Sequence, residues 1–413
     1  MDIAAFQALL TPDGQALLAE TAAADVSEAG LLATASRLRE RHPAALVAAA
    51  LTQVRLRVRA RAKFGPDADR MYFTAAGLEQ STRASVAAHR AHRFRTDLHG
   101  ARVLELCGGI GADLIALTRA GCRVEAVDLD PLTVAVARAN LDALGLSGAA
   151  TVRQGDATRT DPAGFAAVFA DPGRRTERGR VFDPRAYEPP LATVLDLAGQ
   201  APAGCVKVAP GIPHEVIPDG VEAEWISDGG AVKEAALWLG RLASGGSAGA
   251  VARRATLLSQ HRTHTLVPDP ALGPPPVGPW RRYLYEPDGA VIRAHLVAEV
   301  AAGIDGVLAD PRIAYITSDR LVASPFAGGY EIHDVLPFSL KGLRAELRRR
   351  DIGGVTIKKR GSAVDIERLR RDLRLSGTAQ VTLVLTRVAD APIVLLCRPI
   401  SAPTPATADN AKS

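Results

Sequence analysis

The sequence predicts an α/β protein built on a doubly wound parallel sheet, with a helical region before it and a small α+β domain after it. Ala-rich and Leu-rich helical patterns fill the first part of the chain. From Ala101 onward, short apolar runs alternate with Gly-rich turns and amphipathic helices. Such alternation is typical of a parallel sheet with helices on both faces. A shorter, Arg-rich alternation of strands and helices follows near the C-terminal end.

Residues 1–97 are expected to form the helical region. Within it, LTQVRLRVRAR (51–61) alternates apolar and Arg residues, which would also suit a strand. We favour a helix because Ala and Arg are strong helix formers and the flanking AALVAAALTQ continues without a breaker. A second helix is expected over Glu79–Phe94.

The sheet core is expected at 98–268. Its strand-like runs are ARVLEL, CRVEAVDL, ATVRQGD, AAVFADP, GCVKVAP, EAEWIS and RATLLS. Residues 269–330 are predicted to be a linker and connecting elements, because the stretch PDPALGPPPVGPW is too rich in Pro for a helix or a central strand.

The C-terminal domain is expected at 331–403, in the order strand, helix, strand, helix, strand, strand. Ser339 and Asp365 are the expected N-caps of its two helices, whose Leu residues recur on one face. The tail 404–413 lacks large apolar residues to bury and is expected to be disordered.

Composition limits the class of protein. A chain of 413 residues is long enough for two or three domains. Its four Cys lack CxxC spacing and its His lack ligand spacing, so we expect neither a disulfide framework nor a metal. The N-terminus does not resemble a secretory signal, and no run reaches the roughly 20 apolar residues that span a bilayer, so a cytoplasmic protein without a membrane partner is expected. The net charge of +5 is only mildly basic, and nothing indicates the oligomeric state.

The first core strand runs directly into the turn Cys107-Gly108-Gly109-Ile110-Gly111 and then into a helix. Glycines allow the backbone to approach a ligand, and a helix N-terminus offers amide donors. A dinucleotide-binding fingerprint would need a third glycine where Leu114 stands, and here the acid Glu105 opens the motif. We therefore regard a dehydrogenase as the weaker alternative.

Acidic residues follow the next two strands. Asp128 ends the second strand, where a carboxylate can accept both hydroxyls of a ribose. Asp130 is expected to cap a helix that begins at Pro131. Asp156, followed by Ala157, ends the third strand, where it could accept from an adenine amino group. Together these strand ends predict a nucleoside at the carboxyl edge of the sheet.

The fourth strand ends in Asp171-Pro172-Gly173-Arg174-Arg175. Asp171, with Pro172, could orient the group that reacts, or Asp-Pro could simply end the strand. Arg174 and Arg175 could bind a substrate phosphate, or they could be solvated loop charges.

These motifs resemble the class I S-adenosylmethionine-dependent methyltransferases over roughly 98–240. Glu105-x-Cys107-x-Gly109-x-Gly111 matches the first motif of that family, with Cys107 in place of its usual first glycine. Asp128 matches the ribose acid, and Gln154-Gly155-Asp156 matches the turn beside the adenine.

The resemblance implies a Rossmann-like sheet and S-adenosylmethionine as cofactor. It implies that Glu105 orders the loop or accepts from the methionine amino group, and that Asp171 and Pro172 are catalytic. Amino-group methyltransferases commonly have Pro and then an aromatic residue after this Asp-Pro pair, and here both are missing.

The C-terminal domain carries a dense run of Arg and Lys that includes Lys358, Lys359 and Arg360. Such a run could be a solvated surface or a patch that neutralises phosphates. Two segments of this domain resemble the THUMP-like domain that is fused to methyltransferase cores in bacteria. They are Phe338-Ser-Leu-Lys-Gly-Leu and Val355-Thr-Ile-Lys-Lys-Arg-Gly. Met71-Tyr-Phe-Thr and Tyr283-Leu-Tyr-Glu-Pro-Asp-Gly also recur in that family. Because THUMP domains bind RNA, the resemblance implies RNA as the partner.

The leading hypothesis is therefore a methyltransferase that acts on RNA, either rRNA or tRNA. One alternative is a non-catalytic RNA-binding protein that retains the methyltransferase fold, because the motif after the fourth strand is truncated. The other is a methyltransferase for a small molecule or a protein. The sequence does not indicate which RNA or which atom is methylated.

Overall fold

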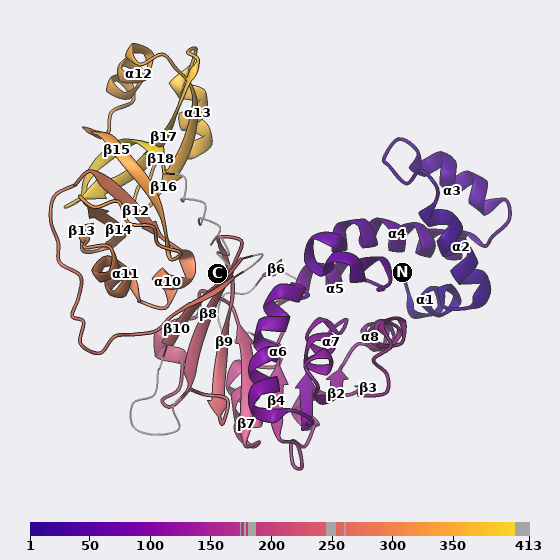
Figure 1. The fold of residues 1–413 in the computed structure, drawn as a ribbon. Coiled ribbons are helices and arrows are strands. Elements are labelled where there is room, and N and C mark those ends of the chain that lie inside the picture. The colour runs from indigo at the N-terminus through magenta and orange to yellow at the C-terminus, as the bar shows by residue number, and fades with distance from the viewer. Residues whose placement is uncertain (174, 177–178, 181–186, 245–252, 260–261, 401–413) are drawn as a thin grey trace, which may run out of the picture. The chain divides into compact units, whose positions relative to one another are not determined.

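The computed structural model describes residues 1–173, 175–176, 179–180, 187–244, 253–259 and 262–400. It divides into two compact units, one formed by 1–228 with 233–252 and the other by 229–232 with 253–413 (Figure 1). The predicted tail 404–413 lies outside the described residues.

A series of helices precedes the first strand: α1 (Ile3–Leu9), α2 (Pro12–Ala22), α3 (Leu31–Arg39), α4 (Ala44–Phe64), η1 (Gly65–Asp69), α5 (Ala75–Gln80) and α6 (Ala84–Leu98). The helix predicted over 51–61 is confirmed as part of α4. Buried side chains of these helices, such as Phe6 and Phe64, share one hydrophobic core with Ile115 and Val136 of the helices that follow. The helical region is therefore part of the first unit's core.

The single helix predicted over Glu79–Phe94 is wrong, because the chain breaks at Ser81 between α5 and α6. Ser81 is extended, with φ −60° and ψ 144°. Lys63 of α4 donates to the carbonyls of Leu78, Glu79 and Ser81 at 2.6, 2.9 and 2.8 Å, and so satisfies carbonyls that the break leaves without helical partners.

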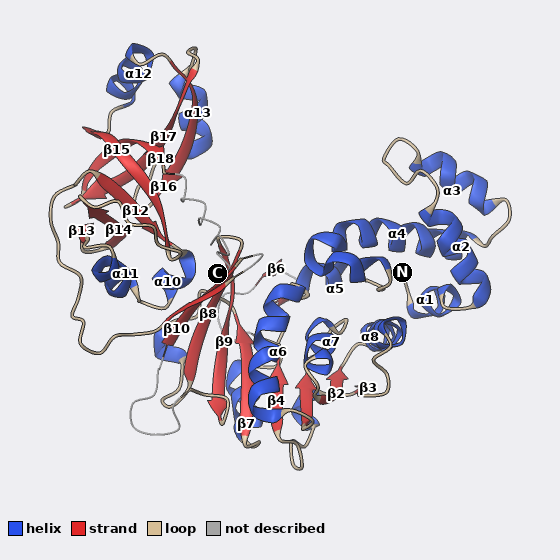
Figure 2. Ribbon diagram, in the orientation of Figure 1, coloured by secondary structure: helices blue, strands red, loops and turns tan. Residues whose placement is uncertain are grey.

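The sheet of the first unit confirms the predicted Rossmann-like α/β fold. Its strands lie in the order β8-β9-β7-β4-β1-β2-β3 (Figure 2). Strands β3, β2, β1, β4 and β7 pair in parallel. Helices α7 and α8 pack against β2, and α9 packs against β4 and β7. The elements are β1 (Arg102–Leu106), α7 (Ala112–Arg119), β2 (Arg123–Asp128), α8 (Pro131–Leu144), β3 (Ala150–Gln154), η2 (Ala157–Arg159), β4 (Ala167–Ala170), β5 (Arg175–Thr176), β6 (Gly179–Arg180), α9 (Leu191–Gly199), β7 (Ala203–Val208), η4 (His214–Val216), β8 (Glu222–Asp228) and β9 (Ala231–Gly240).

The sheet is mixed, whereas the sequence predicted it to be parallel throughout. Strand β9 pairs with β7 in the antiparallel direction, and no strand was predicted at 231–240. Gly229 and Gly230 connect β8 to β9 with φ of +61° and +77°. Two such residues in sequence form the hairpin turn that reverses a chain between adjacent strands. Asp228-Gly229-Gly230 was therefore a signal for this hairpin.

The second unit contains a seven-stranded sheet in the order β13-β14-β12-β15-β18-β17-β16, with α12 and α13. The predicted order of strands and helices from 331 onward is confirmed, and Ser339 and Asp365 cap the two helices as predicted. Leu343, Leu347, Leu369 and Leu373 pack on the sheet. The elements are β10 (Arg253–Leu258), β11 (Thr263–Leu266), β12 (Tyr283–Pro287), α10 (Gly289–Arg293), α11 (Val297–Gly303), β13 (Val307–Asp310), β14 (Ile313–Ser318), β15 (Ala327–Pro337), α12 (Leu340–Arg349), β16 (Ile352–Lys359), α13 (Ile366–Leu373), β17 (Ala379–Val388) and β18 (Ala391–Pro399).

Among the helices in the described part of the chain, none has the length and hydropathy needed to cross a bilayer.

Candidate functional site

A cleft of about 930 Å³ lies where β1, β2, β3 and β4 end in the first unit. Two further segments form its walls, one from Thr74 to Thr82 around α5 and one from Tyr187 to Pro190 before α9. The predicted site residues that line the cleft are Cys107, Gly109, Asp128, Asp156, Ala157, Asp171 and Pro172. The topology therefore gathers most of the predicted strand-end residues around one space.

The loop after β1 has left-handed backbone at Cys107 and Gly109, with φ of +60° and +56°. A Cβ built on Gly109 would meet no atom within 4 Å, so this residue faces open space in the cleft. Burial raises the pKa of the Cys107 thiol to about 12, which keeps the thiol protonated and makes it a poor nucleophile. The loop can therefore let a ligand approach its backbone, but Cys107 is not equipped for covalent catalysis.

Asp128 links the end of β2 to this loop. Its carboxylate accepts from the N–H of Gly109 at 2.9 Å and from the N–H of Asp130 at 3.0 Å. Burial raises the pKa of Asp128 above its ordinary value. Each carboxylate oxygen has a further lone pair available for a ligand hydroxyl. Asp130 caps α8, which begins at Pro131 as predicted.

Asp156 lies after β3 and holds the turn at that strand end. Its carboxylate accepts from the N–H of Thr158 at 2.9 Å and from the hydroxyl of Thr158 at 2.7 Å. These bonds lower the pKa of Asp156 from its ordinary value. Ala157 is buried beside it in the cleft wall.

Glu105 and Gly111 lie behind the cleft lining. Gly111 precedes α7 and is buried. Glu105 is 1 % exposed and lies under the loop, where a Cβ on Gly108 would be 3.8 Å from its carboxyl group. Burial, together with the carboxylates of Asp113 and Asp171, raises the pKa of Glu105 well above its ordinary value. This environment favours the protonated carboxyl group.

Asp171 follows β4 and forms an ion pair with Lys207 of β7, a residue that the sequence analysis did not single out. Lys207 is 4 % exposed and lines the cleft, and it also donates to the hydroxyl of Thr82 at 3.0 Å. Pro172 is buried next to Asp171. Arg174 lies outside the described residues, and of Arg175 the structure describes only its backbone in β5.

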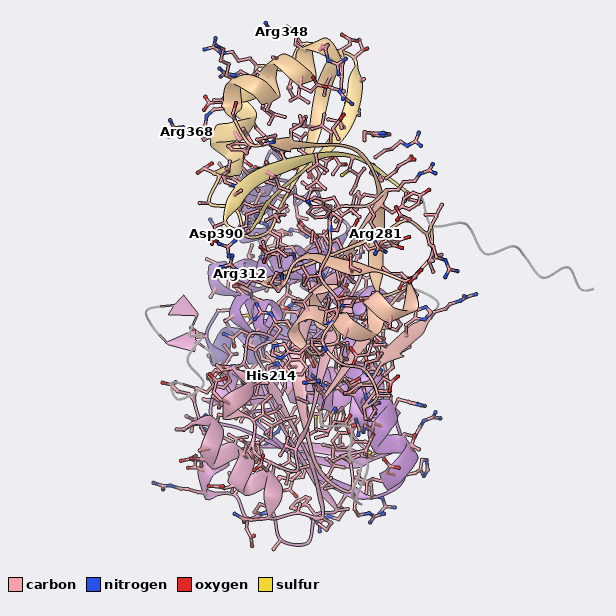
Figure 3. The ribbon with its side chains drawn as sticks, turned by 90° about the vertical axis from the view of Figure 1, so that its left-hand side faces the viewer. His214, Arg281, Arg312, Arg348, Arg368 and Asp390 are labelled. Carbon is pink, nitrogen blue, oxygen red and sulfur yellow. The ribbon has the colours of Figure 1, made fainter. Side chains whose placement is uncertain are left out.

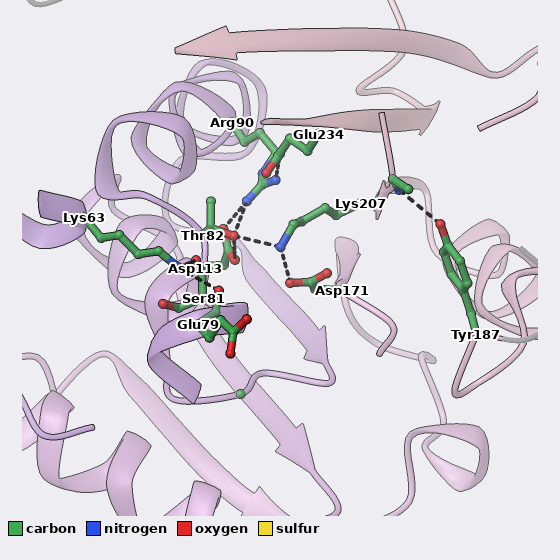
Figure 4. A network of polar contacts seen from close by, with 12 residues as sticks. Lys63, Glu79, Ser81, Thr82, Arg90, Asp113, Asp171, Tyr187, Lys207 and Glu234 are labelled. Carbon is green, nitrogen blue, oxygen red and sulfur yellow. Dashed lines mark hydrogen bonds and ion pairs between the residues drawn. The ribbon is translucent and has the colours of Figure 1, made fainter. Parts of the chain in front are cut away.

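A buried polar network extends from this ion pair (Figure 4). Thr82 donates to Asp113 at 2.9 Å and lies 3.4 Å from the guanidinium of Arg90. Arg90 is 2 % exposed and pairs with both Asp113 and Glu234. The ordinary signal for such groups is a charged residue in an apolar run, which Lys207 has between Val206 and Val208. Arg90 lacks this signal, because His89 and other polar residues surround it in the sequence.

The segment before α9 is held beside Asp171 by backbone bonds. The N–H of Gly173 donates to the carbonyl of Glu188 at 2.8 Å, and the N–H of Glu188 donates to the carbonyl of Gly173 at 3.0 Å. The hydroxyl of Tyr187 accepts from the N–H of Ala209 at 3.1 Å, and the Tyr187 side chain is 1 % exposed. The sequence analysis did not predict that this segment belongs to the site.

The cations of the second unit differ in their partners. Lys358 pairs with Glu286 at 2.6 Å, and Arg360 lies 3.7 Å from the same carboxylate. Lys359 is exposed and donates to the carbonyl of Val364 at 3.0 Å. On α12 and α13 the side chains of Arg348 and Arg368 extend away from the sheet (Figure 3).

Other cations of these two helices are also exposed. Lys341, Arg348 and Arg370 have no carboxylate within 4 Å among the residues that the structure describes. The charge available to a phosphate-bearing partner therefore lies chiefly on α12 and α13.

Comparison with known proteins agrees with this architecture. Residues 327–399 match the family model of the THUMP domain-like proteins, and residues 2–60 match a domain of unknown function. A crystal structure from Porphyromonas gingivalis W83, of a protein assigned as a methyltransferase, has a TM-score of 0.70. It is 22 % identical in sequence, over 87 % of this chain and 92 % of that chain, which supports the fold.

Two curated relatives come from Mycobacterium tuberculosis, strains CDC 1551 and H37Rv, and each is described as an uncharacterized S-adenosylmethionine-dependent methyltransferase. Each is 37 % identical over 340 residues, which is 79 % of this chain and 88 % of the relative. With this identity over most of both chains, the protein belongs to the family of S-adenosylmethionine-dependent methyltransferases that carry a C-terminal THUMP-like domain.

Proposed function

We propose that this methyltransferase modifies RNA. The observation that carries the proposal is the THUMP-like segment, on whose helices α12 and α13 lie exposed cations without carboxylate partners. THUMP domains are RNA-binding modules, and contacts to phosphate give affinity for any nucleic acid whatever its base sequence.

In this proposal the cofactor lies along the strand ends of the cleft. The open space at Gly109 supports a close approach of the ligand to the loop backbone, because a side chain there would fill the same space. Asp128 would accept the ribose hydroxyls and Asp156 would lie at the adenine edge. Glu105 would order the loop from below. Asp171, with Pro172, would face the acceptor.

The test is transfer of labelled methyl groups by the full chain. Tritiated S-adenosylmethionine is incubated with RNA, protein and small-molecule fractions prepared from cells that lack the gene. We expect label in the RNA fraction alone, and we expect Asp128→Ala to abolish it. Label in the protein or small-molecule fraction instead would contradict the proposal.

A second measurement separates catalysis from binding. If no fraction is labelled while the chain binds S-adenosylhomocysteine in calorimetry and retains RNA in a gel-shift assay, the non-catalytic alternative is correct. If the folded chain does not bind S-adenosylhomocysteine, and Asp128→Ala changes nothing, the proposed cofactor site is wrong.

A further inference from the structure

Lys207 is an unusual residue for its place in the fold. It lies in β7, a strand that is buried along its whole length, yet its ammonium reaches the cleft. A lysine is rarely buried unless it is paired, because removing its charge from water is costly. Lys207 is paired with Asp171, which is the residue at the acceptor end of the proposed site.

The ammonium of Lys207 has one donor left for a ligand. A lysine carries three N–H donors. One of them contacts the Asp171 carboxylate and one contacts the Thr82 hydroxyl, and the third has no partner among the described residues. The second oxygen of Asp171 also has no hydrogen-bond partner in the described part of the chain, and its side chain is 24 % exposed.

The network behind Lys207 fixes its position. Thr82 accepts from Lys207 and donates to Asp113, and Asp113 is in turn paired with the buried Arg90. Arg90 is held on its other side by Glu234 (Figure 4). Because each group is buried and has its partner, the ammonium is oriented before any acceptor arrives.

The described cleft offers no aromatic face to a base. Its one aromatic lining residue in the described chain is Tyr187, whose ring is buried and whose hydroxyl is already bonded to Ala209. Methylation of an exocyclic amino group also requires a free nitrogen lone pair. A nearby ammonium would donate a hydrogen bond to that lone pair and oppose its attack.

A hydroxyl acceptor fits the same groups well. A hydroxyl can donate its proton to a carboxylate while its oxygen accepts from an ammonium. We propose that the atom methylated is the 2′-oxygen of a ribose in RNA, and that the ion pair of Asp171 and Lys207 activates this hydroxyl group. This inference rests on the proposed function.

The methyl transfer can be written with Asp171 as the proton acceptor and Lys207 as the hydrogen-bond donor. When bound, the cofactor supplies a methyl group on a positively charged sulfur, and the C–S bond breaks with its electron pair left on sulfur. The acceptor oxygen forms the new O–C bond while its O–H bond breaks, and the proton passes to the free oxygen of Asp171. Lys207 donates its third N–H to the acceptor oxygen and stabilises the negative charge that develops there. Asp171 then returns the proton to water through the open cleft.

The experiment identifies the position of the methyl group. RNA from cells with and without the gene is digested to nucleosides, and mass spectrometry assigns each methyl group to the ribose or to the base. We expect one ribose-methylated nucleoside to disappear on deletion. Loss of a base-methylated nucleoside instead would overturn this inference and leave RNA as the acceptor, whereas no change in any nucleoside would overturn both proposals.

Variants of Lys207 and Asp171 test the roles of these two side chains in methyl transfer. Lys207→Met, expressed in the deletion cells, should lower the ribose-methylated nucleoside by about 100-fold or more, because general acid–base groups contribute at least that much. Its affinity for S-adenosylhomocysteine, measured by calorimetry, should stay within about twofold. Lys233→Met, the same change at a neighbouring strand position outside the cleft, is the matched control and should restore the nucleoside.

If Lys207→Met fails to bind S-adenosylhomocysteine, its loss of methylation is a folding defect. The isosteric variant Asp171→Asn then decides, because it keeps the shape of the side chain and removes the proton acceptor. Full methylation by either variant, with cofactor binding intact, would mean that the ion pair is structural and would overturn the inference.

Discussion

The carboxylate of Asp128 accepts a hydrogen bond of 2.9 Å from the backbone N–H of Gly109. This bond joins the end of β2 to the loop after β1, and Gly108 reinforces it by donating to the carbonyl of Val127 at 3.2 Å. The shape of the loop therefore depends on a carboxylate that we also expect to hold the ribose. Changes on either side of the bond should affect the cofactor before they affect the fold.

Gly109→Val should abolish cofactor binding while leaving the protein folded. The new side chain would project into the open cleft, and the left-handed backbone would cost about 1–3 kcal/mol of stability. Calorimetry with S-adenosylhomocysteine and thermal unfolding measure the two effects. Gly100→Val is the matched control, since Gly100 also has a positive φ of +75° and open space around it but lies outside the cleft. Equal loss of binding in both variants would show that backbone strain alone is responsible.

Arg90→Met should destabilise the fold by about 3–5 kcal/mol, because it leaves the buried carboxylates of Asp113 and Glu234 without their cation. Urea unfolding measures the loss. Arg61→Met removes an ion pair with Asp69 whose side chains are 60 % and 52 % exposed, so it should cost roughly 0–1 kcal/mol. A loss below about 1 kcal/mol for Arg90→Met would mean that the two carboxylates are stabilised by other groups.

Glu105→Gln should change how stability depends on pH. Burial is the main cause that raises the pKa of Glu105 well above its ordinary value of 4.5. As pH rises above 4.5, the Glu105 carboxyl group loses its proton in the unfolded chain but keeps it in the folded chain. The free energy of unfolding of the native protein therefore falls with rising pH until the raised pKa is passed.

Gln cannot titrate, so the variant should lack this decline. Its melting temperature should rise relative to the native protein as pH increases above 4.5. Glu40→Gln, an exposed glutamate at the end of α3, controls for the loss of one carboxyl group. A constant difference across the pH range would show that Glu105 is ionised in the folded protein.

Local patterns predicted the parts of the structure that local forces determine. The cap at Asp130, the helix at Pro131 and the strand-end acid Asp128 each depend on residues a few positions apart. The hairpin at Gly229-Gly230 was equally local, and its turn signal was missed.

The buried network could not be predicted in the same way. Lys207 and Thr82 are 125 residues apart, and Arg90 and Glu234 are 144 apart. The pairing of these groups depends on the tertiary fold, which brings Lys207 of β7 to Thr82 and Glu234 of β9 to Arg90 of α6. The sequence showed Lys207 inside an apolar run, without its partners, and gave no such signal for Arg90.

The exposed cations of α12 and α13 should carry most of the affinity for RNA. Replacing Lys341, Arg348 and Arg370 with Ala should weaken binding and reduce the slope of log affinity against log salt by about 2, since each phosphate contact contributes roughly 0.7–0.9. Gel-shift titrations between about 50 and 200 mM salt measure both quantities. Calorimetry with S-adenosylhomocysteine should show the same cofactor affinity, because these residues belong to the other unit.

Replacing Lys358, Lys359 and Arg360 with Ala should act in the same direction and leave cofactor affinity unchanged. We expect its effect to be smaller, because Glu286 already neutralises part of the charge of Lys358 and Arg360. The comparison of the two triple variants therefore shows whether RNA affinity depends on the total positive charge or only on the cations that have no carboxylate partner. RNA affinity that neither variant changes, or that does not respond to salt, would mean that these cations are ordinary solvated surface and that the second unit does not bind RNA through its phosphates.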